Sequence, residues 1–271
     1  MRTNSALSYF GSDSEVAERL AKPLDSVSHV TIPFVGGGSI IPYLKAKAIV
    51  CNDLNSEVYT FYQCAKGSLG IDQQDRLLSR CHATISHPTE LAVASEILGE
   101  FAEQKTDYED LWQVAWACWA SCWVGRKGHG GSAKLSGSVS YRSRADGGNN
   151  ASRLSSVKHD LSEWLKQIER CEFRCVDFRK CLDGVSDSED CGLYVDPPFV
   201  VKARKYKHDF EYEDHIHLAN RLNAFGKCKI VVRYGDHQLI RDLYKGWQFV
   251  ELASRNQSNV DKPELMLIKN V

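Results

Sequence analysis

The stretch HVTIPFVGGGSIIPYLKAKAIVCND, residues 29–53, decides the fold class. An apolar run typical of a strand, HVTIPFV, leads into three consecutive glycines, and a short segment of helical character, IIPYLK, follows. A second apolar run then ends in Asn-Asp. Strand, glycine loop, helix and strand in this order open α/β nucleotide-binding folds. The sequence therefore predicts an α/β fold whose first two strands lie in this stretch.

The glycine loop and the acid that ends the second run are candidate ligand-binding features. Gly36, Gly37 and Gly38 allow backbone to approach a ligand closely, and the helix start after them offers unpaired N–H groups. Asp53 stands where dinucleotide folds place an acid on ribose hydroxyls. The third glycine of the pyrophosphate fingerprint is absent, which favours an adenosine cofactor without phosphates and argues against a dehydrogenase. A glycine-rich turn that binds nothing is the alternative.

The pattern of the chain changes at the end of this region. Residues 72–124 show helical periodicity, and four tryptophans recur there at three- and four-residue spacing. We expect them to form a buried aromatic stripe, with a base-stacking surface as the alternative; they are Trp112, Trp116, Trp119 and Trp123. The next segment, residues 125–153, is rich in glycine, serine and basic residues.

Strand and helix patterns resume after residue 153. A helix near 154–170 precedes the strands CEFRCV and CGLYV, and a helix near 212–224 precedes the strand KIVVRY. WQFVEL and PELMLIKN, at the end, have the pattern of an antiparallel hairpin. We therefore expect a catalytic domain formed by residues 1–66 and 154–271, interrupted by a helical, basic insertion at residues 67–153.

A loop whose residues are suited to catalysis follows the apolar strand CGLYV, at the edge where α/β sheets bind ligands. It reads Asp196-Pro197-Pro198-Phe199. The two prolines stiffen the loop and remove two N–H donors, which leaves carbonyl oxygens to accept hydrogen bonds. The Asp196 carboxylate and the Pro197 carbonyl could accept both N–H bonds of an aromatic amine and aim its lone pair at an electrophilic methyl group. Phe199 would stack on the base, and a rigid loop with an incidental acid is the alternative.

A second acid-aromatic pair, Asp177-Phe178, follows the predicted strand CEFRCV. The acid there could accept a hydrogen bond from an adenine amino group of the cofactor, with the phenyl ring against the purine. Equally, Asp177 could cap a helix that begins near Phe178. The residues alone leave both interpretations open.

Positive charge is concentrated locally, although the formal net charge is only −1. Arginine and lysine on flexible backbone can reach phosphates, and arginine can pair with guanine edges in the major groove. Such segments could therefore contact a nucleic acid, with solvated surface loops as the alternative. The basic residues of the insertion are Arg126, Lys127, Lys134, Arg142 and Arg144, and those after DPPF include Lys202, Arg204 and Lys205.

Other classes of protein lack support in the sequence. Ten cysteines are present without a C-x-x-C pair, which favours buried thiols and predicts no metal site. No apolar run approaches the roughly 20 residues that cross a bilayer. The first residues lack the apolar stretch of a signal peptide, so we expect a cytoplasmic protein without membrane association.

Together these motifs resemble the Dam-like, adenine-specific DNA methyltransferases over nearly the whole chain outside the insertion. YFGSDSE at residues 9–15 is similar to the family's N-terminal cofactor motif, PFVGGGS to its glycine loop, CNDLN to its ribose-binding acid and YVDPPF to its catalytic signature. The glycine loop precedes DPPF, as in the class whose target-recognition domain lies between the two. HDFEYEDHIHLANRL and KIVVRYGD look like the corresponding segments of phage and prophage members.

The resemblance implies a Rossmann-like sheet and an enzyme dependent on S-adenosylmethionine. Such an enzyme transfers a methyl group to the exocyclic amino group of an adenine flipped out of duplex DNA, in a bacterial or phage-infected cell. Asp196, Pro197, Pro198 and Phe199 would hold the base. The residues implied to contact the cofactor are Tyr9, Phe10, Gly11, Phe34, Gly36, Gly38, Asp53, Asp177 and Phe178. One departure is Asp13, which stands where the family usually has a lysine that anchors the first motif, and which could instead cap the helix that follows.

Three alternatives stay open at this point. Methylation of a cytosine amino group uses the same chemistry, but that group more often has serine at the first position of the tetrapeptide, so Asp196 favours adenine. RNA or protein amide targets fit less well with a long basic insertion. A catalytically inactive DNA-binding protein is the alternative from another class, because of Asp13. The recognition sequence and the role, in restriction-modification, host regulation or phage defence evasion, are not readable from these residues.

Overall fold

The computed structural model describes residues 5–8, 14–103, 110–125, 149–200, 208, 210–252 and 263–271. Its contacts divide the chain into two compact units, which are described here one at a time. The sheet unit consists of Asp13–Val35, Tyr43–Leu54 and Arg170–Val271. The helical unit consists of Met1–Ser12, Gly36–Pro42 and Asn55–Glu169. The expected insertion at residues 67–153 falls inside the helical unit. Its bounds as a target-recognition region stay a prediction.

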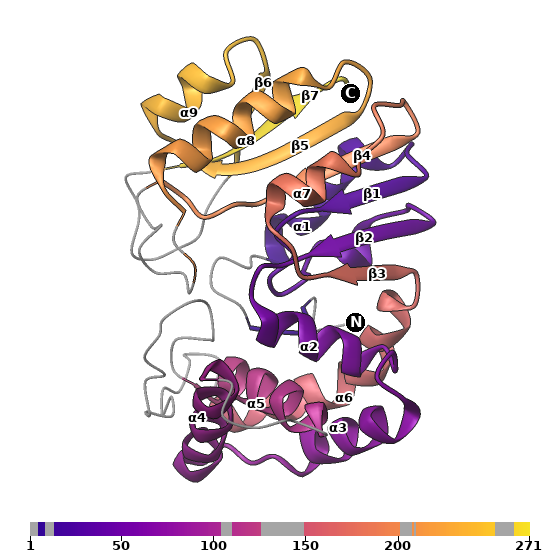
Figure 1. Ribbon diagram of the computed structural model, residues 1–271, viewed down its shortest axis with the longest axis vertical. Coiled ribbons are helices and arrows are strands. Elements are labelled where there is room, and N and C mark those ends of the chain that lie inside the picture. The colour runs from indigo at the N-terminus through magenta and orange to yellow at the C-terminus, as the bar shows by residue number, and fades with distance from the viewer. Residues whose placement is uncertain are drawn as a thin grey trace. The chain divides into compact units, whose positions relative to one another are not determined.

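Within the described residues, seven strands form one mixed sheet in the order β3-β2-β1-β4-β5-β7-β6 (Figure 1). The strands β1 to β5 pair in parallel, and β7 runs antiparallel between β5 and β6. The expected α/β fold is confirmed, and so is the expected pairing of the last two strands. The strand bounds are β1 His29–Ile32, β2 Ala48–Asn52, β3 Cys171–Arg174, β4 Cys191–Val195, β5 Lys229–Gly235, β6 Gln248–Leu252 and β7 Glu264–Lys269.

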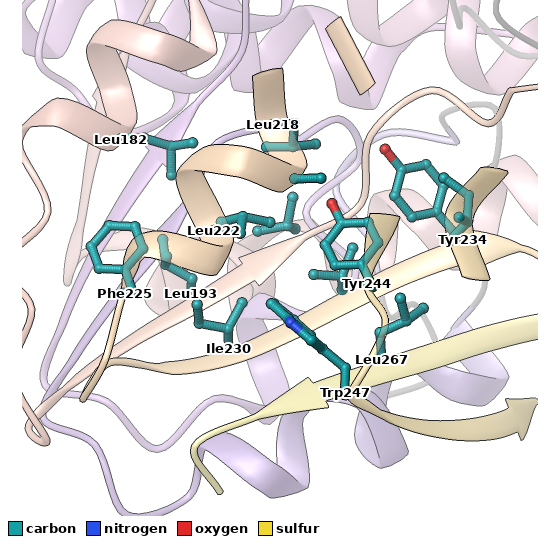
Figure 2. Close-up of a cluster of buried hydrophobic side chains, with 14 of the residues drawn as sticks. Leu182, Leu193, Leu218, Leu222, Phe225, Ile230, Tyr234, Tyr244, Trp247 and Leu267 are labelled. Atoms are coloured by element: carbon teal, nitrogen blue, oxygen red, sulfur yellow. The ribbon is translucent and has the colours of Figure 1, made fainter. Parts of the chain in front are cut away.

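One face of the sheet packs against three helices, α7 (Phe178–Asp183), α8 (Tyr212–Ala224) and α9 (Gln238–Leu243). Side chains alternate between faces along a strand, so every second residue of β4, β5 and β7 points toward these helices. Figure 2 shows Leu193, Ile230 and Leu267 from the strands beside Leu218 and Leu222 from α8. This cluster fixes which residues of β4, β5 and β7 face the opposite side.

The opposite face carries α1 (Ser14–Ala21) and a turn of 3-10 helix, η1 (Lys22–Leu24). Gly192 of β4 points to this face, and a Cβ atom there would lie 2.9 Å from Val27 Cγ2 and 3.0 Å from Leu24 Cδ2. A side chain at residue 192 would therefore displace η1 from the sheet. Only a hydrogen atom fits at this position of β4.

The order of the parallel strands reverses between β1 and β4, which are neighbours in the sheet. Ligands of open α/β sheets bind outside the carboxyl ends of the strands at such a switch point. Thr31 pairs with Leu193, so continuing the register by three residues brings Phe34 and Asp196 to the same level. The two strongest sequence motifs thus end side by side in the sheet unit.

The helical unit contains α2 (Ser56–Ala65), α3 (Ile71–Ala83), α4 (Pro88–Ala102), α5 (Leu111–Val124) and α6 (Asn150–Ile168). Helix α5 is its core, because every residue from Val114 to Val124 is buried. The Trp116 indole donates a hydrogen bond to Thr84 Oγ1 at 2.8 Å, and the Trp123 indole donates to the Ala6 carbonyl at 2.8 Å. The prediction of a buried aromatic stripe is confirmed for Trp116, Trp119 and Trp123, whereas Trp112 is half-buried.

The glycine loop belongs to the helical unit from Gly36 to Pro42. Gly36 and Gly38 have φ angles of 47° and 69°, a region that favours glycine. The Tyr62 hydroxyl donates to the Gly36 carbonyl at 2.9 Å, and a Cβ atom on Gly38 would lie 2.7 Å from the same hydroxyl oxygen. Glycine is thus required here by backbone and by packing. The short helix expected after the loop is a single 3-10 turn, η2 (Ile41–Tyr43).

The cysteines are all free thiols, and only Cys175 and Cys191 are half-buried rather than buried. In the described part of the chain, no group of three or more His, Cys, Asp or Glu side chains is arranged to hold a metal ion. No described helix has the length and apolar character needed to span a membrane.

Candidate active site at the carboxyl edge of the sheet

One buried amide joins the ends of β1, β2 and β3. Asn52, the last residue of β2, is 1% exposed. Its Nδ2 donates to the carbonyls of Pro33 at 3.0 Å and Val176 at 2.9 Å, and its Oδ1 accepts from the Val176 N–H at 3.0 Å. Its own carbonyl accepts from the Val35 N–H at 2.8 Å. Asn52 therefore fixes the backbone on either side of three predicted cofactor contacts, Phe34, Asp53 and Asp177.

Phe34 is half-buried and belongs to a triangle of rings in the sheet unit. Its ring centroid lies 5.6 Å from that of Phe178 and 5.7 Å from that of Phe210, and the latter two lie 5.5 Å apart. Phe178 is only 6% exposed. In the structure the buried ring of Phe178 thus packs against the ring of Phe34. A direct contact of Phe178 with the cofactor stays a prediction.

Asp177 caps helix α7. Its Oδ1 accepts from the Arg179 N–H at 2.9 Å, and its carboxylate pairs with the Arg179 guanidinium at 3.2 Å. Arg179 also pairs with Asp214 in the first turn of α8 and lies over the Phe178 ring, 4.4 Å from its centroid. The capping interpretation of Asp177 is confirmed. A carboxylate has about four acceptor sites, so the cap leaves capacity for a further donor.

The residues at this edge suit the chemistry of S-adenosylmethionine. Asp53 follows β2, is half-buried, and is anchored by its N–H, which donates to the Arg174 carbonyl at 3.2 Å. A partly exposed carboxylate at this point can accept from ribose hydroxyls, and the half-buried ring of Phe34 can pack on a purine. Two carboxylates and an aromatic ring fit the ribose hydroxyls and the adenine of such a cofactor.

Asp196 begins the loop after β4, and the sheet register places Arg233 beside it. Val195 pairs with Val232, so the next residues of the two strands are neighbours. Arg233 Nη1 lies 3.2 Å from Asp196 Oδ2, and the Tyr194 hydroxyl lies 3.3 Å from the same oxygen. The Asp196 side chain is 23% exposed, compared with 3% for Arg233. The carboxylate thus stands at the boundary between the sheet and solvent.

Glu264, the first residue of β7, holds the other side of Arg233. Its Oε2 accepts from Arg233 Nε at 3.0 Å and from Nη2 at 2.5 Å. Leu265 and Leu267 face the core under α8, so alternation puts Glu264 on the opposite face, with Arg233 and Tyr194. Two acids and one arginine form a buried network with one excess negative charge.

The protonation of Asp196 follows from this setting. Burial raises the pKa of Asp196 above its ordinary value, and the negative charge of Glu264 adds to that rise. The Arg233 guanidinium acts in the opposite direction, by its charge and by its hydrogen bond. The pKa of Arg233 itself is raised by the two acids, so it stays a cation. Arg233 is therefore the main group that favours the ionised carboxylate, and the hydrogen bond from the Tyr194 hydroxyl lowers the pKa of Asp196 in the same direction.

The rest of the DPPF loop packs against the end of β5. Pro197 is buried, whereas Pro198 and Phe199 are half-buried. A Cβ atom on Gly235 would lie 3.2 Å from Phe199 Cδ2, and the Phe199 and Tyr234 ring centroids lie 6.1 Å apart. Gly235 therefore allows the Phe199 ring to lie close to the strand. Its contact with a base stays a prediction.

Several predicted residues lie outside the described part of the chain. They are the N-terminal motif with Asp13, the basic residues of the insertion from Arg126 to Arg144, and the basic cluster that contains Lys202, Arg204 and Lys205. Arg153, at the end of the basic segment, is described, and it lies in α6 with its guanidinium over Trp123, 4.8 Å from the ring centroid.

The sequence analysis did not single out Asn52, Tyr194, Arg233 or Glu264. A signal existed for two of them, because KIVVRY carries Arg233 within its apolar run and PELMLIKN carries Glu264 directly before one. Glu and Arg are almost never fully buried unless they are paired, so opposite charges in two apolar strands make a candidate buried ion pair. The pairing itself depends on strand register across the sheet.

Comparison with known proteins agrees with this geometry. The family model of the D12 class N6 adenine-specific DNA methyltransferases matches residues 9–258. The Type II methyltransferase M.MjaIII of Methanocaldococcus jannaschii is 22% identical over 275 residues, which cover 91% of this chain and 88% of the relative. The match spans the glycine loop, the edge fixed by Asn52 and the DPPF loop. The chain belongs to the D12 class of N6 adenine-specific DNA methyltransferases, which use S-adenosylmethionine as the methyl donor.

Proposed function

We propose that Asp196 and the Pro197 carbonyl accept the two N–H bonds of an adenine amino group, with Phe199 against the base. The adenine would have to leave the duplex to reach this loop, because its amino group is paired and stacked inside B-DNA. Phe34, Asp53, Asp177 and Phe178 would bind the cofactor at the neighbouring strand ends, together with Tyr9, Phe10, Gly11, Gly36 and Gly38. The observation that carries the proposal is that Phe34 and Asp196 follow β1 and β4, the neighbouring parallel strands at the switch point of the sheet.

The role of the residues follows from the electronic structure of the amine. The adenine amino lone pair is delocalised into the ring, so the free amine is a poor nucleophile. Two acceptors on its N–H bonds favour a pyramidal nitrogen whose lone pair is localised and directed. When held by Phe34, Asp53 and Asp177, the cofactor would supply the methyl group as an electrophile on a sulfonium, whose leaving group is a neutral thioether that keeps the electron pair of the C–S bond. The extra proton then leaves the nitrogen toward the Asp196 carboxylate or water.

The first experiment measures transfer of labelled methyl groups to DNA by purified variants. Asp196→Ala is expected to lower the rate by at least about a hundredfold, the cost of removing one preorganised group that stabilises a transition state. Asp196→Asn keeps the shape but replaces one acceptor oxygen by a donor, and it is expected to lose activity as well. Asp183→Asn, at an exposed acid of α7, is the matched control. A parent rate in Asp196→Ala overturns the proposal.

Target recognition is proposed for the insertion at residues 67–153 and for the basic residues after DPPF. The candidates are Arg126, Lys127, Lys134, Arg142, Arg144, Lys202, Arg204 and Lys205. Each phosphate contact adds roughly 0.9 to the slope of log binding constant against log salt. Reversing the charge of Arg142 and Arg144 together is expected to weaken binding to duplex DNA and to flatten that slope. Unchanged affinity and slope contradict this assignment.

We propose that the chain methylates adenine in one fixed sequence context, in restriction-modification or in the marking of phage or prophage DNA. The relative named a Type II methyltransferase supports this proposal. Expression in a host without DNA methylation, followed by sequencing of modified bases, gives the test. Methyladenine in one context is expected. Methylcytosine contradicts the proposal, and unmodified DNA with no cofactor binding by calorimetry indicates an inactive DNA-binding protein.

A further inference from the structure

We propose that Arg233, braced by Glu264, is a positioning residue that determines which oxygen of Asp196 faces the target amino group. The inference rests on the proposed function, because it requires Asp196 to bind that amino group. It adds a second layer to the site, from two strands that lie beyond the DPPF loop in the sequence.

The two oxygens of the Asp196 carboxylate are not equivalent in the structure. Arg233 Nη1 and the Tyr194 hydroxyl both contact Oδ2, at 3.2 and 3.3 Å. Among the described residues these are the contacts of the carboxylate, and they leave Oδ1 as the oxygen available to a ligand. A carboxylate held at one oxygen by two donors cannot rotate freely about its Cβ–Cγ bond. Its free oxygen therefore keeps one direction.

The guanidinium that holds Oδ2 is itself fixed. Nε and Nη2 both donate to Glu264, so the planar group has one orientation and presents Nη1 toward Asp196. An arginine can serve both acids in this way because its donors form a rigid fork, whereas a lysine ammonium offers a point charge. Arg233 and Glu264 are 3% and 8% exposed. Burying such a pair costs desolvation energy, and replacing one by apolar residues is often neutral or stabilising, so stability alone does not account for it.

The network also sets the charge of Asp196. The groups that act on its pKa are Tyr194 from β4, Arg233 from β5 and Glu264 from β7. Removing Arg233 and Glu264 together leaves the carboxylate buried without its cation. Arg233 has the larger effect of the two on the pKa of Asp196, so the net result is a rise of that pKa. The effect of Arg233 on the orientation of Asp196 can therefore be separated from its effect on the charge of Asp196, by variants that keep or remove the cation.

The test compares Arg233→Lys with the double variant Arg233→Met/Glu264→Met. Arg233→Lys keeps the charge and loses the fork, and the double variant removes the cation of Asp196 without leaving Glu264 as a second buried acid. The rate of methyl transfer in a single turnover is measured from pH 5 to 9, with cofactor affinity by calorimetry and folding by circular dichroism. Arg221→Met is the matched control, because Arg221 contacts the Leu182 carbonyl near the far end of α8.

Both Arg233 variants are expected to lose about ten- to hundredfold in rate, the range that corresponds to one charge-assisted hydrogen bond at a reacting group. The acid limb of the pH profile should keep its position in Arg233→Lys and move to higher pH in the double variant. Cofactor affinity should stay at the parent value. If Arg233 served folding alone, its variants would lose rate only in proportion to the fraction of folded protein. The acid limb of the pH-rate profile would then stay at its parent position.

Two outcomes overturn the inference. One is a folded Arg233→Lys protein with the parent rate. This result overturns the inference even if the double variant does not fold. The other is a folded double variant whose rate and acid limb match the parent. Asp196→Ala, assayed in parallel, separates this failure from that of the proposed function. If Asp196→Ala is inactive while the Arg233 variants are normal, only the positioning role is lost.

Discussion

At the carboxyl edge of the sheet, the ends of β1, β2 and β3 are joined by a neutral amide, whereas the ends of β4 and β5 are joined by buried charges. Asn52 makes its hydrogen bonds to backbone groups and changes no ionisation. Arg233 and Glu264 contact Asp196 and each other through side chains. The neutral side, at the ends of β1, β2 and β3, is predicted to bind the cofactor. The charged side, at the ends of β4 and β5, is predicted to bind the base.

The difference matches what each side has to do. A cofactor site has to place ribose and purine contacts at fixed distances, and a neutral network does this at any pH near neutrality. The base side has to offer an ionised acceptor in one direction, which requires a cation close to a carboxylate that burial would otherwise protonate. The cofactor side is thus expected to respond to changes of shape, and the base side also to changes of charge.

The largest expected effect comes from the neutral side. Asn52→Leu leaves the carbonyls of Pro33 and Val176 and the N–H of Val176 without partners in a buried setting. Each orphaned group costs about 1–3 kcal/mol, so we expect a loss of about 4 kcal/mol in the free energy of unfolding, measured in urea. Cofactor affinity should fall in the protein that remains folded.

Asn52→Asp sharpens this test because it keeps the acceptor for Val176 N–H but turns an oxygen toward the two carbonyls to which Asn52 donates. It should destabilise the protein at neutral pH, and less at low pH, where the protonated acid can donate one hydrogen bond. A Leu variant as stable as the parent, with unchanged cofactor affinity, shows that the three strand ends are fixed by other contacts.

The next effect concerns pH and lies on the charged side of the edge. His215 of α8 is 1% exposed, and its Nδ1 lies 2.9 Å from the Tyr234 hydroxyl, on the face of β5 opposite to Arg233. Burial lowers the pKa of His215 to about 4. The unfolded chain binds a proton at this histidine below about pH 6.5, whereas the folded chain binds it only near pH 4. The contribution of neutral His215 to the free energy of unfolding is therefore complete above about pH 6.5 and is lost as the pH falls toward 4.

The expected loss between pH 7 and pH 4 is about 3 kcal/mol from this residue. His215→Gln keeps a hydrogen-bonding side chain that does not titrate in this range. Unfolding in urea at several pH values should show that the parent loses stability faster than the variant between pH 6.5 and 4. Parallel curves for the two proteins contradict the assignment of this pH dependence to His215.

The fold was predictable where local patterns carry it. The run at residues 29–53 and the strand CGLYV predicted two parallel strands with ligand-binding ends, because apolar length and glycine loops are local signals. The helix α9 (Gln238–Leu243) was not expected, since it is short and only Ile240 in it is buried. The insertion of β7 between β5 and β6 depends on long-range pairing, which no local pattern encodes.

The site divides in the same way. Asp53 and Asp196 were predictable, because each directly follows an apolar strand. Arg233 and Glu264 meet only through the register of β5 with β4 and β7. Asp177 shows a third case, in which one residue satisfies two patterns and the structure confirms the cap without testing the binding role.

A smaller effect is expected in the helical unit, at the glycine loop. Gly38→Ala forces a Cβ atom to within 2.7 Å of the Tyr62 hydroxyl, at a φ of 69°. The left-handed backbone alone costs about 1–2 kcal/mol, so we expect a total loss of about 2 kcal/mol in the free energy of unfolding. Combining it with Tyr62→Phe removes the clashing oxygen, so the double variant should lose less than the sum of the two single variants. Additive losses contradict a direct clash.

The smallest expected change in stability also separates the two interpretations of Asp177. Asp177→Ala removes the N-cap of α7 and should cost about 1 kcal/mol in the free energy of unfolding. Asp177→Asn keeps an oxygen for the Arg179 N–H, because asparagine caps helices about as well as aspartate, and it loses the charge and one carboxylate oxygen. Unfolding in urea should therefore leave Asp177→Asn close to the parent.

Cofactor affinity then decides the role of Asp177. If its carboxylate accepts a hydrogen bond from the adenine amino group of the cofactor, calorimetry should show about a tenfold weaker affinity for Asp177→Asn, since the amide can turn only one oxygen either to the cap or to the ligand. Asp183→Asn, at the other end of the same helix, should bind as the parent does. Parent affinity in Asp177→Asn would assign Asp177 to the cap alone and leave Asp53 and Phe34 as the polar and apolar contacts on the neutral side of the edge.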